Sequence, residues 1–164
     1  MKSIFLSLGS NLGNKKEIID KALYAIDKRI GRVLKKSHFY ETQPWGYISS
    51  NNFFNICIEI ESNLSPFDIL NISKMIEIDF HRTEKTTNVY KDRTLDIDIL
   101  FYQNNIIRTA HLIIPHIEVN FRKFVLVPMN EIAYDFVHPI TQKTISETLS
   151  ICADKNRIKK IEIL

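Results

Sequence analysis

Residues 93–102 read RTLDIDILFY, an apolar run that carries two aspartates one residue apart and an arginine at its entrance. Successive side chains of a strand point to opposite faces, so Asp96 and Asp98 share one face while the neighbouring leucine and isoleucines share the other. The apolar face predicts a strand over 95–102 that packs under helices. On the opposite face the aspartate Cα atoms are expected about 7 Å apart, given a rise of about 3.3 Å per residue.

The paired carboxylates predict a metal site. Two like charges this close repel each other unless a cation lies between them. Their hard oxygen ligands suit Mg²⁺, which binds one or two carboxylates and completes its shell with water and phosphate oxygens. Arg93 beside the pair, with Arg82 upstream, adds the guanidinium groups typical of polyphosphate sites. The alternative is a solvent-exposed strand face without function, but aspartate is disfavoured in strands, and two of them here favour the metal site.

Length and composition predict one domain over residues 1–164. The chain has 45% hydrophobic residues, four glycines and five prolines, and no repeat or linker. The charge of +3 is spread along the chain, unlike the dense basic stripe of a nucleic-acid-binding protein. Two cysteines, an N-terminus without a cleavage-site pattern, and no apolar stretch near the roughly 20 residues of a membrane span favour the cytoplasm. We expect binding to neither nucleic acid nor membranes. A monomer is the expected state, although nothing in the sequence fixes it.

Periodicity along the chain predicts an α+β fold. Strands are predicted over 3–8, 33–41, 53–61 and 95–102, and helices over 14–30 and 65–81. Asn14 and Ser65 are the predicted N-caps, and Gly31 is predicted to end the first helix. The order β, α, β, β, α, β matches a ferredoxin-like sandwich, an antiparallel sheet with helices packed on one face, here with a C-terminal extension.

The C-terminal extension carries weaker signals. Residues 103–105 (QNN) predict a hairpin turn into Ile106 and Ile107. Residues 145–152 have helical spacing, with Ser146 as the N-cap. His116 followed by Arg122 is a candidate phosphate-contacting pair.

Aromatic and amide side chains form a second candidate patch. They lie in TQPWGY (42–47) and in FFN, which opens the strand over 53–61. Phe53 and Asn55 face the same side as the aspartates if Ile56 faces the helices. An aromatic ring with a nearby amide can hold a flat heterocycle and read its edge. Core packing is the alternative, and it is the better interpretation for the phenylalanine between them.

Five short segments, spread in order over nearly the whole chain, carry a resemblance to a known family. They are SLGSNLGN at 7–14, YETQPWGY at 40–47, FFN at 53–55, RTLDIDIL at 93–100 and IPHIEVNFRKFVL at 114–126. Together they resemble the 6-hydroxymethyl-7,8-dihydropterin pyrophosphokinase family. The resemblance implies a ferredoxin-like fold, two Mg²⁺ ions, and transfer of pyrophosphate from ATP to the hydroxymethyl group of the reduced pterin. It also implies that AMP is released and that the reaction belongs to folate biosynthesis.

The resemblance implies roles for individual residues. The catalytic residues are Arg82, Arg93, Asp96 and Asp98, and the two aspartates are also the metal ligands. The pterin pocket consists of Thr42, Pro44, Trp45, Phe53, Asn55 and Phe124. The ATP side consists of Glu77, Arg82, Arg93, His116 and Arg122. The polar segment 83–92 is expected to close over ATP as a lid.

The chain departs from the family pattern in three places. Tyr90-Lys91-Asp92 stands where Trp-Gly-Pro usually precedes the arginine, and Glu84 stands where a second lid arginine often appears. Ile117 follows the histidine where an aromatic residue or proline is common. These departures leave the metal residues intact and bear on lid closure and adenine contacts.

Two other functions remain open on the residues alone. A nucleotidyltransferase also pairs a Gly-Ser motif with D-x-D, but there the motifs lie on neighbouring elements, whereas Gly9-Ser10 and Asp96 lie far apart in this chain. A non-catalytic ferredoxin-like module that binds RNA would carry aromatic and basic residues on its central strands. The predicted metal strand carries aspartates instead, which repel phosphate unless a metal is bound.

Overall fold

The computed structural model describes residues 1–81 and 91–162. Its sheet strands are β1 (Lys2–Ser10), β2 (Arg32–Lys36), β3 (Phe39–Thr42), β4 (Phe53–Ser62), β5 (Asp96–Tyr102) and β8 (Ile158–Ile161). Its helices are α1 (Lys15–Arg29), α2 (Pro66–Asp79), α3 (Lys123–Ala133) and α4 (Ile145–Ser150). In the described part of the chain the six strands form one antiparallel sheet along the path β5-β1-β4-β3-β8, with β2 also paired to β4.

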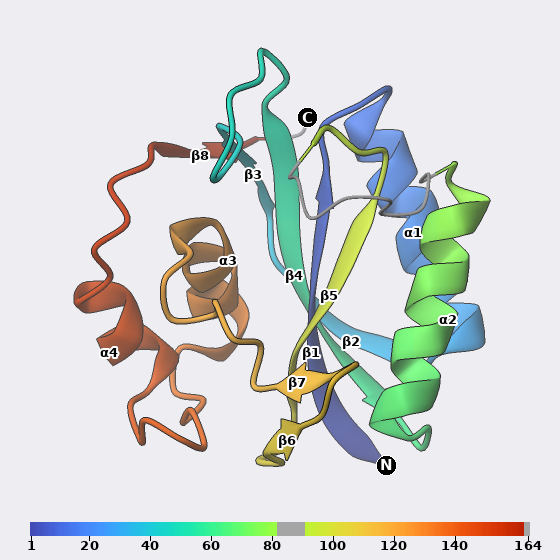
Figure 1. The fold of residues 1–164 in the computed structure, drawn as a ribbon, viewed down its shortest axis with the longest axis vertical. Helices are drawn as coiled ribbons and strands as arrows, with labels where there is room; N and C mark the ends of the chain where they lie inside the picture. The colour runs from blue at the N-terminus through green and yellow to red at the C-terminus, as the bar shows by residue number, and fades with distance from the viewer. Residues whose placement is uncertain (82–90, 163–164) are drawn as a thin grey trace.

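One face of the sheet carries the larger core. Ile4, Leu6 and Leu8 of β1 are fully buried and pack with isoleucines of β4 and β5. Helices α1 and α2 cover this face and bury Ile26 and Ile76 against it (Figure 1). Full burial of each such side chain contributes roughly 1.5–3 kcal/mol, so this apolar layer dominates the stability of the sheet.

The opposite face is covered as well, which corrects the prediction of helices on one face only. Phe5 and Cys57 alternate onto this second face, Phe101 joins them after a register shift in β5, and the three form a separate core with Val125 and Met129 of α3. Helix α4 packs against α3 (Figure 1). A sheet with apolar side chains on both faces needs a layer on each, because either face would otherwise expose them to water.

Most predicted elements form close to the predicted boundaries. Asn14 and Ser65 cap α1 and α2, each side chain accepting a hydrogen bond from a backbone N–H three residues ahead. Helix α1 ends with Ile30 as its C-cap, directly before Gly31, as predicted. A Cβ atom at Gly31 would lie 2.3 Å from the carbonyl oxygen of Glu61, so close packing on β4 requires the glycine.

Two strand predictions are wrong in detail. The strand predicted over 33–41 is split into β2 and β3, because the Ser37 hydroxyl bonds both the Cys57 N–H and the next carbonyl at the break. A turn forms after β5, but the following strand β6 (Ile107–Arg108) pairs with β7 (Ile113–Ile114) and not with β5. Gln103 adopts φ 50° there, which turns the chain away from the sheet.

The C-terminal elements differ from prediction in two ways. Thr144, not Ser146, caps α4 through a reciprocal capping box with Glu147. Strand β8 pairs with β3 and has no predicted counterpart, because its sequence IKKI lacks the alternation of a half-buried strand. In the part of the chain that the structure describes, no helix has both the length and the apolar character needed to cross a membrane.

His138 packs against the second core. Its side chain is 3% exposed, and its ring meets that of Phe101 edge-on at a centroid distance of 5.4 Å. Its Nδ1 accepts hydrogen bonds from the backbone N–H groups of Ile140 and Thr141 at 3.1 and 3.2 Å, so this nitrogen carries no proton. Burial lowers the pKa of His138 below its ordinary value.

His138→Asn is expected to make the fold less sensitive to acid. The unfolded chain protonates His138 below about pH 6.5 while the folded chain resists it, so stability is retained above that pH and lost below it. Asparagine keeps an oxygen acceptor and does not titrate. Urea unfolding at about pH 7.5 and about pH 5.5 should show a smaller loss of unfolding free energy in the variant. Equal losses in both proteins would contradict this role.

Candidate active site

A cavity of about 150 Å³ opens on the second face of the sheet, beside the core under α3. Strands β1, β4 and β5 form its floor, and the loop between β3 and β4 and the start of α3 form its walls. The lining residues are Ser7, Gly9, Thr42, Gln43, Trp45, Phe53, Asn55, Arg93, Asp96, Asp98, His116, Glu118, Arg122 and Phe124. Segments from most of the chain therefore meet at one site.

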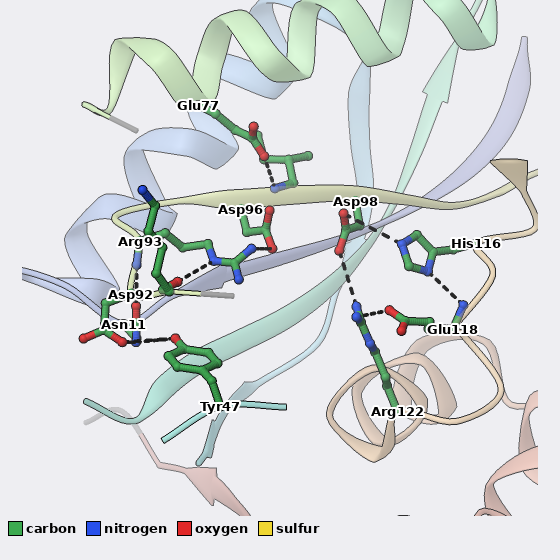
Figure 2. A network of polar contacts seen from close by, with 12 residues as sticks. Asn11, Tyr47, Glu77, Asp92, Arg93, Asp96, Asp98, His116, Glu118 and Arg122 are labelled. Carbon is green, nitrogen blue, oxygen red and sulfur yellow. Dashed lines mark hydrogen bonds and ion pairs between the residues drawn. The ribbon is translucent and has the colours of Figure 1, made fainter. Parts of the chain in front are cut away.

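Asp96 and Asp98 both reach this cavity, as the strand alternation predicts. They leave β5 on the same side (Figure 2), while Ile97 and Ile99 enter the core under α1 and α2. The Asp96 side chain is 23% exposed and that of Asp98 is 33% exposed. Both carboxylates are therefore accessible from the cavity to a ligand.

Basic groups flank the two aspartates at both ends. Arg93 Nη1 lies 2.8 Å from Asp96 Oδ2, an ion pair with hydrogen-bond geometry. Asp98 faces Arg122 Nη1 at 4.0 Å and His116 Nε2 at 3.9 Å (Figure 2). These separations exceed hydrogen-bond length but still give electrostatic attraction. The cavity thus offers carboxylates in the centre with two guanidinium groups and an imidazole around them, an arrangement that suits a metal-bound phosphate.

Arg122 is oriented by several neighbours. It pairs with the Glu118 carboxylate, and its Cζ lies 4.7 Å from the ring centroid of Trp45 and 5.5 Å from that of Phe124. His116 Nδ1 accepts a hydrogen bond from the Glu118 N–H at 3.2 Å, and its Nε2 is turned toward Asp98. The sequence did not predict Glu118, whose only signal is its spacing of four from the arginine.

Phe53 and Asn55 project from β4 into the cavity on the side of the aspartates, as predicted. The Asn55 amide donates to Thr42 Oγ1 at 2.8 Å, which fixes its orientation. Gly9 of the neighbouring strand leaves room for it, because a Cβ atom there would come within 3.0 Å of Asn55 Oδ1. The floor therefore presents an aromatic ring and an oriented amide, which suit a flat polar ligand.

Two predicted site residues lie outside the cavity lining, and a third lies outside the described residues. Pro44 is half-buried in the β3–β4 loop and does not line the cavity. Arg82 belongs to residues 82–90, outside the described residues, as does most of the predicted lid. Glu77 lies on α2, across β5 from the cavity (Figure 2).

Glu77 supports the strand that carries the aspartates. Its side chain is buried, and Oε1 accepts a hydrogen bond of 2.7 Å from the backbone N–H of Ile97. Ile97 lies between the two aspartates on the outer edge of the sheet, where no strand among the described residues pairs with β5. The carboxylate therefore supplies the acceptor that a further strand would have supplied.

The aspartate pair fits Mg²⁺ in ligand type and number. Magnesium is commonly held by one or two carboxylates, with water and phosphate oxygens completing six positions. Among residues 1–81 and 91–162, no cluster of three or more His, Cys, Asp or Glu side chains could hold a metal ion. The described residues are thus suited to a metal that arrives with a phosphate ligand and not to a closed all-protein site.

Sequence comparisons identify relatives over most of the chain. The model of the 7,8-dihydro-6-hydroxymethylpterin-pyrophosphokinase (HPPK) family matches residues 5–134. The 2-amino-4-hydroxy-6-hydroxymethyldihydropteridine pyrophosphokinase of Porphyromonas gingivalis is 40% identical over 141 residues, which cover 85% of this chain and 95% of that protein. The enzyme of the same name from Haemophilus influenzae is 37% identical over 160 residues, covering 97% and 98%.

Solved structures share the fold. A crystal structure of HPPK-DHPS in complex with substrates has a TM-score of 0.78 and 18% identity, and the match covers 99% of this chain. Plasmodium falciparum HPPK-DHPS with pterin and p-hydroxybenzoate has a TM-score of 0.77 and 17% identity. This chain spans 47% of the length of each of these two proteins. At such low identity the likeness concerns the fold alone.

Glu77→Ala is expected to destabilise the fold by roughly 1.5–3 kcal/mol, because it removes a charged acceptor from a buried N–H group. Glu77→Gln keeps an oxygen at the same place and should lose less. Urea unfolding of both variants against the wild type measures the difference. If Glu77→Ala is as stable as the wild type, the carboxylate does not hold β5.

Proposed function

The chain belongs to the 7,8-dihydro-6-hydroxymethylpterin-pyrophosphokinase family, and on this premise we propose how its cavity carries out the reaction. The protein is a pyrophosphokinase of folate biosynthesis. The hydroxymethyl oxygen of the reduced pterin bonds to the β-phosphorus of ATP, the bond from that phosphorus to the AMP oxygen breaks, and the hydroxyl proton is released. The observation that supports our assignment of the residues is that paired aspartates, cationic side chains and an aromatic–amide floor share one cavity.

We assign the pterin to the aromatic end of the cavity. Phe53 of β4 and Phe124 of α3 both line the cavity, and the flat ring would lie between them. Asn55 would read the ring edge, since its amide is already oriented by Thr42. Trp45 would close the pocket from the β3–β4 loop, whose neighbouring Pro44 stays a predicted backbone contact.

We assign the triphosphate to the basic groups beside the aspartates. Arg93 and Arg122 would neutralise the phosphate charges and His116 would donate from Nε2 to a phosphate oxygen, with Arg82 as a further predicted contact. A second cavity of about 640 Å³ shares His116 with the first and has Arg108 and Ile117 in its lining. The shared histidine supports a nucleotide that extends from one cavity into the other. Ile117, which replaces the aromatic residue or proline of the family pattern, would then affect only the binding of the adenosine part of ATP.

Asp96 and Asp98 are the proposed ligands of two Mg²⁺ ions, and ATP is the proposed co-substrate. When bound, the metal ions neutralise phosphate charge and align the triphosphate for in-line attack. The chain itself contributes position and electrostatics: Arg93 holds Asp96, and Glu77 holds the backbone between the aspartates. No covalent intermediate with the protein is required.

We also propose a single domain over residues 1–164 whose core is ferredoxin-like and whose C-terminal extension follows β5. The order β5-β1-β4-β3 with α1 and α2 on one face supports this description. Both cysteines, Cys57 and Cys152, are free, which supports a reducing compartment and thus the cytoplasm. A monomer that acts on small molecules remains our expectation.

The reaction itself is tested by incubating the protein with ATP, Mg²⁺ and 6-hydroxymethyl-7,8-dihydropterin and separating the nucleotide products. AMP should form, and only when the pterin and the metal are both present. Release of ADP, or AMP formation without the pterin, would contradict the proposed transfer. EDTA should abolish turnover, and added Mg²⁺ should restore it.

Asp98→Ala is expected to lower kcat at least about 100-fold, because the metal ions that would neutralise the phosphate charge lose one of their two proposed carboxylate ligands. The variant should remain folded, since the side chain is part-exposed and outside both cores. Asp20→Ala is the matched control, because Asp20 forms only a surface pair with Lys16. Initial rates with saturating substrates, together with circular dichroism, measure both variants. Near-normal activity of Asp98→Ala would rule out its metal role.

A further inference from the structure

Asp92 lies outside the cavity lining and joins segments that are distant in the sequence. Its Oδ1 accepts hydrogen bonds from Asn11 Nδ2 at 2.8 Å and from the Tyr47 hydroxyl at 3.0 Å. Its Oδ2 accepts from the Ser49 hydroxyl at 2.9 Å and from Asn51 Nδ2 at 2.6 Å. Figure 2 shows Asn11 and Tyr47 turned toward this carboxylate. Four donors at these distances use the accepting capacity of one carboxylate fully.

The four donors come from two loops. Asn11 follows β1, and the other three belong to the loop 43–52 between β3 and β4. Asn11 also donates to the carbonyl of Asn51 at 3.1 Å. Its Oδ1 accepts from the N–H of Arg93 at 2.8 Å, and its own N–H donates to the Arg93 carbonyl at 3.2 Å. Two loops and the entrance of β5 are therefore fastened together around Asp92.

Each fastened segment carries a part of the active site. The loop 43–52 carries Trp45, which forms a wall of the cavity. The entrance of β5 carries Arg93, which pairs with the first aspartate of the metal strand. Asp92 does not line the cavity, but its hydrogen bonds join the loop that carries Trp45 to the segment that carries Arg93.

Asp92 and its four donors, here called the Asp92 joint, have a fixed charge state at neutral pH. Burial acts to raise the pKa of Asp92, but the four hydrogen bonds outweigh it and hold the pKa below its usual value. Burial and the bond to this carboxylate raise the pKa of Tyr47 to about 12. Asp92 is therefore an ionised acceptor and Tyr47 a protonated donor.

We propose that Asp92 is a positioning residue for the pterin subsite, which fastens the loop 43–52 to the entrance of β5 and holds Trp45 at its working distance from Arg93. The inference rests on the proposed placement of the pterin beside Trp45.

Asp92→Ala is the direct test. The KM for the pterin should rise roughly tenfold, because the loop must be ordered when the ligand binds, while the KM for ATP stays within about twofold. Trp45 is the only tryptophan of the chain, so its fluorescence reports on the loop directly. Its quenching constant with acrylamide, measured on the ligand-free protein, should rise at least about twofold in the variant.

Two further variants control the test. Tyr47→Phe removes one donor and keeps the ring, so it should fold and shift both readouts in the same direction by a smaller amount. Asp27→Ala is the matched control, because Asp27 also joins two segments, α1 and β2, through a 3.1 Å bond from the Val33 N–H, but neither residue lines the cavity. It should change neither the KM for the pterin nor the quenching of Trp45.

The proposal is overturned if Trp45 quenching is unchanged in Asp92→Ala, or if the KM values for pterin and ATP rise equally. If Asp92→Ala does not fold, the same readouts in Tyr47→Phe decide, and wild-type values there would overturn it. A failure of the proposed function has a different signature: the wild type would form no AMP from ATP and the pterin. The quenching comparison does not depend on that activity.

Discussion

The two-residue period of β5 is the constraint on which the site depends. Over residues 96–99 every second side chain enters the core under α1 and α2, as Ile97 and Ile99 do, before the register shift at Leu100 changes the phase. The side chains between them are thereby fixed on the other face, which puts both aspartates in one cavity without any loop. A slip of one residue in the pairing with β1 would bury the carboxylates and expose the isoleucines. The core thus enforces the register that the chemistry needs.

The second face of the sheet serves two purposes along the same strands. In β1, Phe5 enters the core under α3, while Gly9 leaves room in the cavity floor. In β4, Cys57 lies in that core, while Asn55 faces the cavity. The half of this face that lies under α3 is stabilised by burial of apolar side chains. The half that forms the cavity floor is polar and gains little stability in this way. Helix α3 spans the division, because Phe124 lines the cavity and Met129 packs in the core.

The sequence was informative where a local rule applied. Alternation predicted the shared face of Asp96, Asp98, Phe53 and Asn55, and capping residues predicted the starts of α1 and α2. Contacts between distant segments were not predictable in this way. The bond from Asn11 to Asp92 joins residues whose spacing follows no period, so it became apparent only in the folded chain, and the spacing of four between Glu118 and Arg122 did not by itself reveal their pairing. The cover on the second face was missed for the same reason, although Phe5 and Cys57 alternate onto it.

The position of β5 at the border of the sheet has a consequence for the behaviour of the protein at high concentration. A border strand offers backbone donors to any extended segment of another molecule, and such docking is a common route to aggregation. Glu77 occupies the donor of Ile97 with a buried carboxylate from α2. An intruding strand would have to displace this negative charge and the helix that bears it. The residue that supports the metal strand therefore also occupies a backbone donor that another copy of the chain would need for pairing with β5.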